Sequence, residues 1–298
     1  FLGGRCFGPW VTAFAYGTTY FSAVVFIGFA GKFGWNNGPA SLRIGIGNAI
    51  AGALLAWIVL GRRTRRMTHN LDVMTMPEFF FRRFGLYILK PFSAMIIFIF
   101  LLPYSAGVYK GLAELFVAVF PSVSFSTAII IMAVITGAYL ILGGYFAVAI
   151  TDCIQGVIMI GGSIALVHFI SQAANPGGSL LETARLASQR YAEHKAAGLA
   201  NPGPWYLLPS IICMTSFGCW ALPQMVHKFY AVKDEKMILR GAVVCAIFAL
   251  IIGCAAYFTG SMSHLFFDKL PIVEHGAAQD TLVPRMLVDG RFPQPLLG

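Results

Sequence analysis

Hydrophobic residues occur along this chain in long runs, each about as long as one helical crossing of a bilayer, roughly 20 residues. The runs lack the alternation expected of membrane strands, and they are too long and too many for a cleaved signal peptide. Composition agrees, because 11% of residues are charged, whereas soluble domains carry about 25%. We therefore predict an all-α transmembrane protein with about seven membrane helices, at residues 10–31, 40–61, 87–119, 124–144, 147–170, 205–230 and 238–260.

The first of these runs has an unusually polar centre. Between Gly17 and Ser22 stand three hydroxyl side chains and a tyrosine, where a simple membrane anchor would carry Leu, Ile or Val. Polar groups at this depth are costly unless they face protein, water or a ligand. One interpretation is a helix interrupted here, whose freed backbone lines a transport site. The other is a continuous helix whose hydroxyls bond back to the preceding turn.

Basic residues in the loops predict the orientation. Twelve Lys and Arg fall on the side of loops 62–90 and 227–241, and eight on the side of 171–204 and 261–298. The positive-inside rule makes the first side cytoplasmic and the second external, in a multi-pass protein of the plasma (inner) membrane. This asymmetry also accounts for the net charge of +9, so no nucleic-acid partner is expected.

Two connecting segments are predicted to be helical. Thr75 is placed to cap a short helix with Pro77 in its first turn and Glu78 three residues after the cap. Its aromatic and arginine side chains suit a helix lying on the cytoplasmic membrane surface. The outer segment Leu180–Ala197 has the pattern of an amphipathic helix between Gly/Pro-rich ends.

Four ordered motifs resemble the bacterial sodium/solute symporter family. They are Phe1–Arg5 with Gly8-Pro9; Thr75–Phe80 with Arg82–Gly85; Gly143–Val148 with Thr151-Asp152 and Gln155-Gly156; and Pro223-Gln224 with Lys228-Phe229, Lys233-Asp234 and Arg240-Gly241. Within the family, Thr19–Ala23 and Phe26–Gly28 are more similar to the sodium/pantothenate branch than to the sodium/proline branch. The latter has an aspartate where Tyr20 stands.

The resemblance implies a LeuT-type fold of two inverted five-helix repeats. The seven spans would then be the first repeat and two helices of the second, in one partial core domain over residues 1–298. We expect the chain to be an internal segment of a longer protein. The eighth core helix, which in the family gives sodium side-chain oxygens, would lie beyond Gly298.

The resemblance also implies site residues. Sodium would be held by the backbone carbonyls of Thr18 and Phe21, with Asp152 relaying the cation towards the cytoplasm. The solute-binding positions would be Thr19, Tyr20, Ser22, Thr215, Cys219, Trp220 and Pro223.

Structural alternatives to these roles stand open. Tyr20 and Trp220 suit helix packing, and Asp152 suits a helix N-cap. Lys110 and Glu114 are one helical turn apart and are expected to form a pair, unless Lys110 faces the cavity and attracts a carboxylate. His168 and His227 receive no role.

The expected function is sodium-coupled symport of a small organic solute, a carboxylate, by alternating access, with the proton as the second choice of coupling ion. The partners would be the bilayer, the solute and sodium, with no other cofactor. The alternative is a solute sensor fused to a signalling domain. Walker, nucleophile-elbow and HExxH motifs are absent from the sequence, so we do not expect an enzyme, and no pore-loop pattern favours a channel.

Overall fold

The computed structural model describes residues 7–22, 24–120, 122–271 and 278–289; Phe1–Arg5 of the first motif and Ala23 of the Thr19–Ala23 motif lie outside them. The regular structure of the described residues is helical, apart from one isolated bridge between Phe7 and Val232. Among those residues, five helices are long and apolar enough to cross a membrane, or six when one bent pair is counted as a span. The prediction of an all-α transmembrane protein is confirmed.

The helices from Pro9 to Asn70 form a helical hairpin. Its outward segment comprises α1 (Pro9–Tyr20), η2 (Val24–Phe29) and α2 (Ala30–Asn37), and η3 (Gly38–Ser41) turns the chain with Gly38 at φ 52°. The return segment comprises α3 (Leu42–Gly47), η4 (Asn48–Leu55), η5 (Trp57–Gly61) and α4 (Arg62–Asn70). The outward segment thus continues past residue 31 and the return segment past residue 61, the predicted ends of the first two spans.

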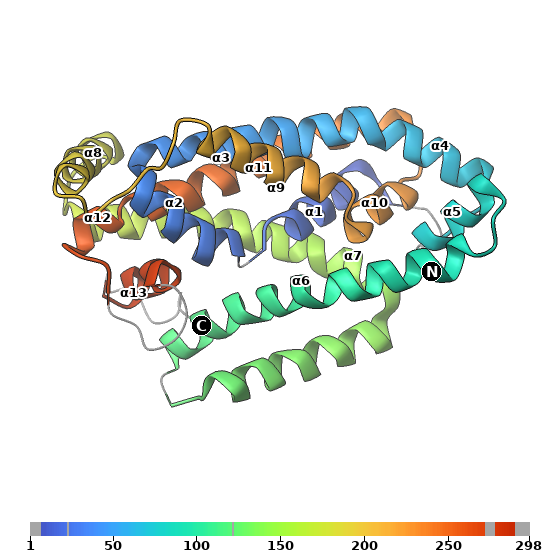
Figure 1. The fold of residues 1–298 in the computed structure, drawn as a ribbon, viewed down its shortest axis with the longest axis horizontal. Helices are drawn as coiled ribbons and strands as arrows, with labels where there is room; N and C mark the ends of the chain where they lie inside the picture. The colour runs from blue at the N-terminus through green and yellow to red at the C-terminus, as the bar shows by residue number, and fades with distance from the viewer. Residues whose placement is uncertain (1–6, 23, 121, 272–277, 290–298) are drawn as a thin grey trace.

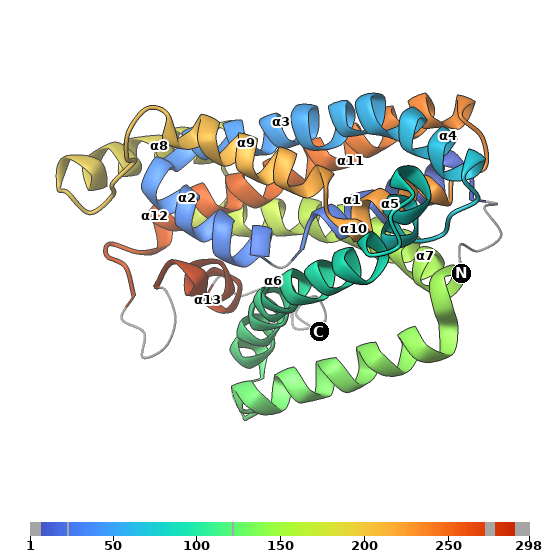
Figure 2. The ribbon, with the colours of Figure 1, turned by 45° about the vertical axis from the view of Figure 1, so that its right-hand side comes forward.

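The next elements form a second hairpin, of which α6 also contacts η2 and α13. Helix α5 (Met76–Phe84) is followed by α6 (Leu89–Val119) and then by α7 (Phe125–Ala174). Gly144, at φ 59° and ψ −166°, divides α7 into pieces of opposite direction, Phe125–Tyr145 and Ala147–Ala174. Figure 2 shows α6 and the first piece of α7 diverging from the body, while the second piece returns to it.

The C-terminal part supplies the central helix. Helix α8 (Leu180–Ala196) begins at a capping box between Ser179 and Glu182, and α9 (Leu207–Trp220) and α10 (Pro223–Tyr230) follow. Then come the central helix α11 (Lys236–Ser261), α12 (Ser263–Phe266), η6 (Ala278–Thr281) and α13 (Leu282–Asp289). Figure 1 shows α4 and α5 at one end of the long axis and α8 and α12 at the other. We call the first, which carries the arginines of α4 and α5, the basic end.

Helix α11 is packed against both segments of the N-terminal hairpin. A methyl group on Gly260 would overlap the backbone of Ala30, and one on Gly45 would overlap the backbone of α11 at Gly253. Glycine at these positions lets two backbones approach closely, which is how membrane helices associate tightly. The outward segment meets α11 at Phe248 near Gly17 and at Gly260 near Ala30. The return segment meets it at Gly253 near Gly45 and at Gly241 near Trp57, so the two segments run in opposite directions along α11.

Two of the membrane segments are broken near their middle. α1 ends at Tyr20, and α9 and α10 meet at a 52° bend. The bend has a local cause, because Leu222 is extended (φ −62°, ψ 128°) before Pro223, whose ring disfavours a helical residue ahead of it. α1 runs away from the basic end, whereas α9 and α10 run towards it (Figure 1), so the broken segments are antiparallel.

Candidate functional site

The break after α1 frees backbone carbonyls. The Phe21 N–H donates to the Gly17 carbonyl at 3.0 Å, and the Val25 N–H donates to the Ser22 carbonyl, also at 3.0 Å. Phe21 itself is extended, at φ −98° and ψ 98°. Within the ranges the structure describes, no backbone N–H donates to the carbonyl of Thr18 or Phe21. These two oxygens are therefore available to another donor or to a cation.

Two hydroxyl groups of this stretch behave as the alternative interpretation expects, because they bond back to the preceding helical turn. Thr18 Oγ1 donates to the Phe14 carbonyl at 3.0 Å, and Thr19 Oγ1 donates to the Ala15 carbonyl at 2.7 Å. Both therefore bond back to the preceding turn, as hydroxyls in a membrane helix commonly do. Ser22 lies outside the helix, in the non-helical stretch after Tyr20. The helix is thus interrupted, and its threonines are partly engaged within α1.

A cavity of about 810 Å³ leads from the last turn of α1 to the basic end. Thr19 of α1 lines it, as does Tyr145 beside the Gly144 turn. Asp152 of α7 and Lys228 of α10 meet in its wall, with Lys228 Nζ 2.6 Å from Asp152 Oδ2. Lys228 is 6% exposed and Asp152 17%, so this is a buried ion pair. The Lys228 ammonium also lies 5.7 Å from the centre of the Tyr145 ring, whose face attracts cations.

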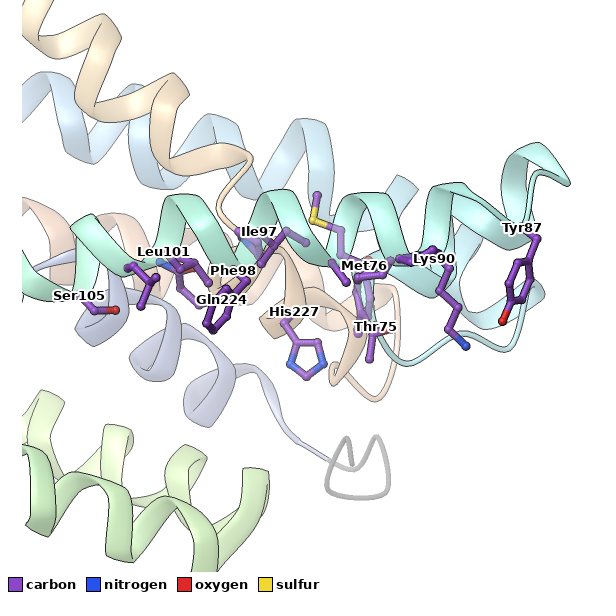
Figure 3. A pocket seen from close by; sticks show the side chains of 16 residues that line it. Thr75, Met76, Tyr87, Lys90, Ile97, Phe98, Leu101, Ser105, Gln224 and His227 are labelled. Carbon is purple, nitrogen blue, oxygen red and sulfur yellow. The ribbon is translucent and has the colours of Figure 1, made fainter.

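A second cavity, of about 1020 Å³, lies on the other side of α10. Figure 3 shows Ile97, Phe98 and Leu101 of α6 beside Gln224 and His227 of α10. Gln224 and His227 line both cavities, so α10 is the wall between them. His227 Nε2 lies 2.9 Å from the Met74 carbonyl, which links α10 to the segment before α5.

Gln224 stands at the break between α9 and α10. Its carbonyl oxygen is buried and has no hydrogen-bond partner among the residues that the structure describes. A buried acceptor without a donor is costly, and such groups are common where a ligand or water binds. In the first turn of α10, Pro223 has no N–H and the Met225 N–H donates to the Leu222 carbonyl at 2.9 Å, so among the described residues the Gln224 N–H is the group of this turn without a backbone acceptor.

Most of the other expected solute-binding residues face the hairpin's return segment. The Tyr20 hydroxyl donates to the Thr215 carbonyl at 3.3 Å, and Trp220 Nε1 donates to the Ala51 carbonyl at 2.9 Å. Thr215 Oγ1 lies 2.7 Å from Asn48 Oδ1. Cys219 is packed against the same cluster. These side chains hold α1 and α9 against η4. Of the expected solute-binding residues, Thr19 lines the 810 Å³ cavity and Pro223 lines the 1020 Å³ cavity, and the others line neither.

Sequence reasoning therefore missed Gln224, His227, Lys228 and Asn48. The signal for Lys228 was present, because a carboxylate in a membrane helix, here Asp152, requires a partner. The pairing expected for Lys110 was also incorrect. Its Nζ lies 3.3 Å from Asp280 Oδ2 of η6 instead of pairing with Glu114, because η6 folds beside α6.

The residues that could hold a cation offer backbone and hydroxyl oxygens. No group of three or more His, Cys, Asp or Glu side chains in the described part of the chain is placed to hold a metal ion. Sodium prefers oxygen ligands, and a broken membrane helix supplies them as carbonyls. The Thr18 and Phe21 carbonyls fit this donor type.

Known proteins of similar sequence identify the family of this chain. The model of the sodium:solute symporter family matches residues 1–288. A sodium/proline symporter of Haemophilus influenzae is 33% identical over 273 residues, covering 86% of this chain and 52% of that protein. A sodium/proline symporter of Staphylococcus aureus is 29% identical over 242 residues, covering 80% of this chain and 45% of that protein. This chain spans about half the length of these relatives. With a family match over nearly its whole length and two antiparallel broken helices beside a charged cavity, the chain belongs to the sodium:solute symporter family.

Proposed function

We propose that this chain is the ion- and solute-binding part of a secondary transporter, which couples sodium entry to uptake of a small organic solute. The observation that carries the proposal is the cavity between α1, α7 and α10, which joins the break in α1 to the buried pair of Asp152 and Lys228. Unsatisfied backbone groups at midmembrane depth persist only where they line a cavity or bind a ligand. The antiparallel broken helices are the arrangement that inverted-repeat transporters use for this purpose.

In this proposal the fold is of the LeuT type. The segments from α1 to α7 form a first repeat of five spans, and the pair α9–α10 with α11 begins a second. The first and sixth spans are then equivalent by a two-fold axis in the membrane plane. Support comes from their opposite directions and their matching breaks (Figure 1). The basic end faces the cytoplasm, which a cysteine-accessibility scan of residues 62–90 and 171–204 would test.

The cation is assigned to the Thr18 and Phe21 carbonyls, with the rest of its shell from other groups of the full-length protein. Asp152 receives the cation on its way to the basic end, at the cost of its contact with Lys228. Since the two carbonyls are next to Ser22, ion and solute would occupy adjacent positions. This proximity couples them, because an ion that orders the break also orders the solute site.

The solute is proposed to be a carboxylate of amino-acid size. The Gln224 N–H at the start of α10 suits a carboxylate, and Gln224 Oε1 accepts an ammonium or imino N–H. Thr19 and Ser22 contribute hydroxyl groups beside the break, and Pro223 lines the second cavity. Tyr20, Thr215, Cys219 and Trp220 act from behind the site, where they hold α1 and α9 in place. Because the relatives described above are named sodium/proline symporters, proline is the first solute to test, and pantothenate the second.

The test is uptake by the full-length protein in proteoliposomes. An inward sodium gradient should drive accumulation of one labelled carboxylate, whereas a choline gradient should not. Ser22→Ala should raise the half-saturating solute concentration, and Ser93→Ala on α6, a half-buried serine that lines neither cavity and bonds back to the Leu89 carbonyl, is the matched control. Accumulation driven by a proton gradient alone would reassign the coupling ion, and uptake that ignores every cation gradient would refute the proposal.

A further inference from the structure

A separate apolar slot lies beneath α5 at the basic end. It has a volume of about 430 Å³ and is lined by α4, α5 and both sides of the break between α9 and α10. Phe79 and Phe80 of α5 form one wall, and Trp220 and Tyr230 stand on either side of the break. The volume is within the range of small-molecule sites, about 300–1,000 Å³.

Two arginines flank this slot. Arg63 lies one helical turn before Met67, a lining residue of α4, and Arg83 lies one turn after Phe79. Both side chains are exposed, and neither forms an ion pair with any residue that the structure describes. The slot therefore combines an apolar interior with two unpaired positive charges at its margin.

The position along the chain places this slot at the membrane surface. The hydrophobic run of the hairpin's return segment ends at Gly61, and four arginines follow within the next five residues. Such a change from apolar to basic sequence marks the boundary between acyl chains and headgroups. A molecule in the slot would have its apolar part in the acyl region and its charged part at the level of Arg63 and Arg83.

We propose that this slot binds an anionic phospholipid, with an acyl chain between α5 and the α9–α10 break and the headgroup phosphate facing Arg63 and Arg83. A soluble anion without an acyl chain fits less well, because the lining of the slot is mostly apolar. On its α4 wall, Thr64 supplies the one side-chain hydroxyl. Each arginine near an anionic headgroup favours it by about fivefold, so two give a preference of roughly 30-fold over a zwitterionic lipid.

A lipid bound in the slot would also affect transport, an inference that rests on the proposed function. Trp220 belongs to α9 and Tyr230 to α10, so any change in the bend angle changes the slot. A ligand shifts an equilibrium only when it binds the two states differently. A lipid in the slot therefore favours the bend angle present here, and the transport rate depends on the anionic lipid content.

The experiment uses the intrinsic fluorescence of Trp220 in the full-length protein. The protein is placed in phosphatidylcholine vesicles that contain increasing amounts of phosphatidylglycerol with brominated acyl chains, which quench tryptophan on contact. The signal of Trp220 is the difference between the parent and Trp220→Phe. We expect brominated phosphatidylglycerol to quench this signal at a mole fraction tens of times lower than brominated phosphatidylcholine does.

The chain offers a control with the same charge change. Arg63→Gln with Arg83→Gln should abolish the lipid preference. Arg62→Gln with Arg82→Gln should keep it, because these neighbours project from other sides of their helices, about 100° away per residue. Equal quenching by the two lipids in the parent, or an equal loss of preference in both double variants, would overturn the lipid site.

Uptake is measured in the same vesicles to separate the two proposals. A lipid preference in quenching without any cation-driven uptake would refute the transport function and leave the lipid site intact. Uptake that proceeds equally well at every phosphatidylglycerol fraction, in a protein that shows the quenching preference, would overturn the coupling to the bend.

Discussion

Replacing Lys228 with methionine is the sharpest test of the charged cavity. The change removes the ammonium and keeps an unbranched apolar side chain, so the Asp152 carboxylate is left without a partner at 17% exposure. Removing one member of a buried pair costs about 3–5 kcal/mol. Since Asp152 retains some contact with the cavity, the lower value of about 3 kcal/mol applies. At about 2–4 °C per kcal/mol, Tm should fall by roughly 6–12 °C.

The assay is thermal unfolding of the detergent-solubilised protein, followed by size-exclusion chromatography of the surviving fraction. Arg66→Met is the control, because Arg66 pairs with Glu235 at 3.1 Å but is 69% exposed. An exposed pair contributes about 0–1 kcal/mol, so its loss should change Tm by at most a few degrees. Equal shifts for Lys228→Met and Arg66→Met would refute the reasoning from burial.

The double variant Asp152→Asn with Lys228→Met completes the cycle. Without a charge on either side chain, the desolvation cost disappears, and stability should return to within about 1 kcal/mol of the parent. Sodium-driven uptake should stay low in the double variant, because asparagine cannot receive the cation as a carboxylate does. Stability and uptake recovering together would remove Asp152 from the ion path.

Three further outcomes are expected elsewhere. Gly260→Ala should destabilise the protein by about 1–3 kcal/mol in the same thermal assay, because the added methyl group meets the Ala30 backbone, which has no rotamer by which to move aside. Thr75→Ala should weaken α5 by about 1 kcal/mol through loss of its N-cap, seen as roughly fivefold faster hydrogen exchange of the α5 amides. Burial, with the positive charge of Arg190, lowers the pKa of His194 on α8, so undocked α8 binds more protons than docked α8. The packing of α8 against the body should be at full strength above about pH 6.5, the ordinary pKa of histidine, and should weaken as the pH falls below that value. Proteolysis of the loop after α8 should therefore increase in acid, and this increase should be smaller in His194→Gln.

Features that depend on neighbouring residues could be predicted from the sequence. The structure has the expected N-cap at Thr75, whose hydroxyl accepts from the Glu78 N–H at 3.3 Å. The break predicted between the spans 124–144 and 147–170 is present because Gly144 adopts a positive φ that glycine tolerates. The polar stretch from Gly17 does interrupt its helix, at Tyr20. In each case the cause lies within a few residues, so a local pattern contains it.

Features that depend on distant partners could not be predicted in the same way. Lys110 was assigned a neighbour one turn away, whereas its partner, Asp280, is 170 residues further on. Asp152 and Lys228 are 76 residues apart, and their meeting depends on the bend at Pro223. Helical spacing decides which residues share a face, but the packing of whole helices decides which faces meet.

The close contact between the N-terminal hairpin and α11 has a consequence for biosynthesis. Ala30 and Gly260 are 230 residues apart, yet their backbones touch. At about 5–20 residues per second, a ribosome needs roughly 10–50 s to make the intervening chain. During that time the hairpin waits in the bilayer with its glycine faces uncovered. Small apolar residues tolerate this delay, because lipid chains can cover them until α11 arrives.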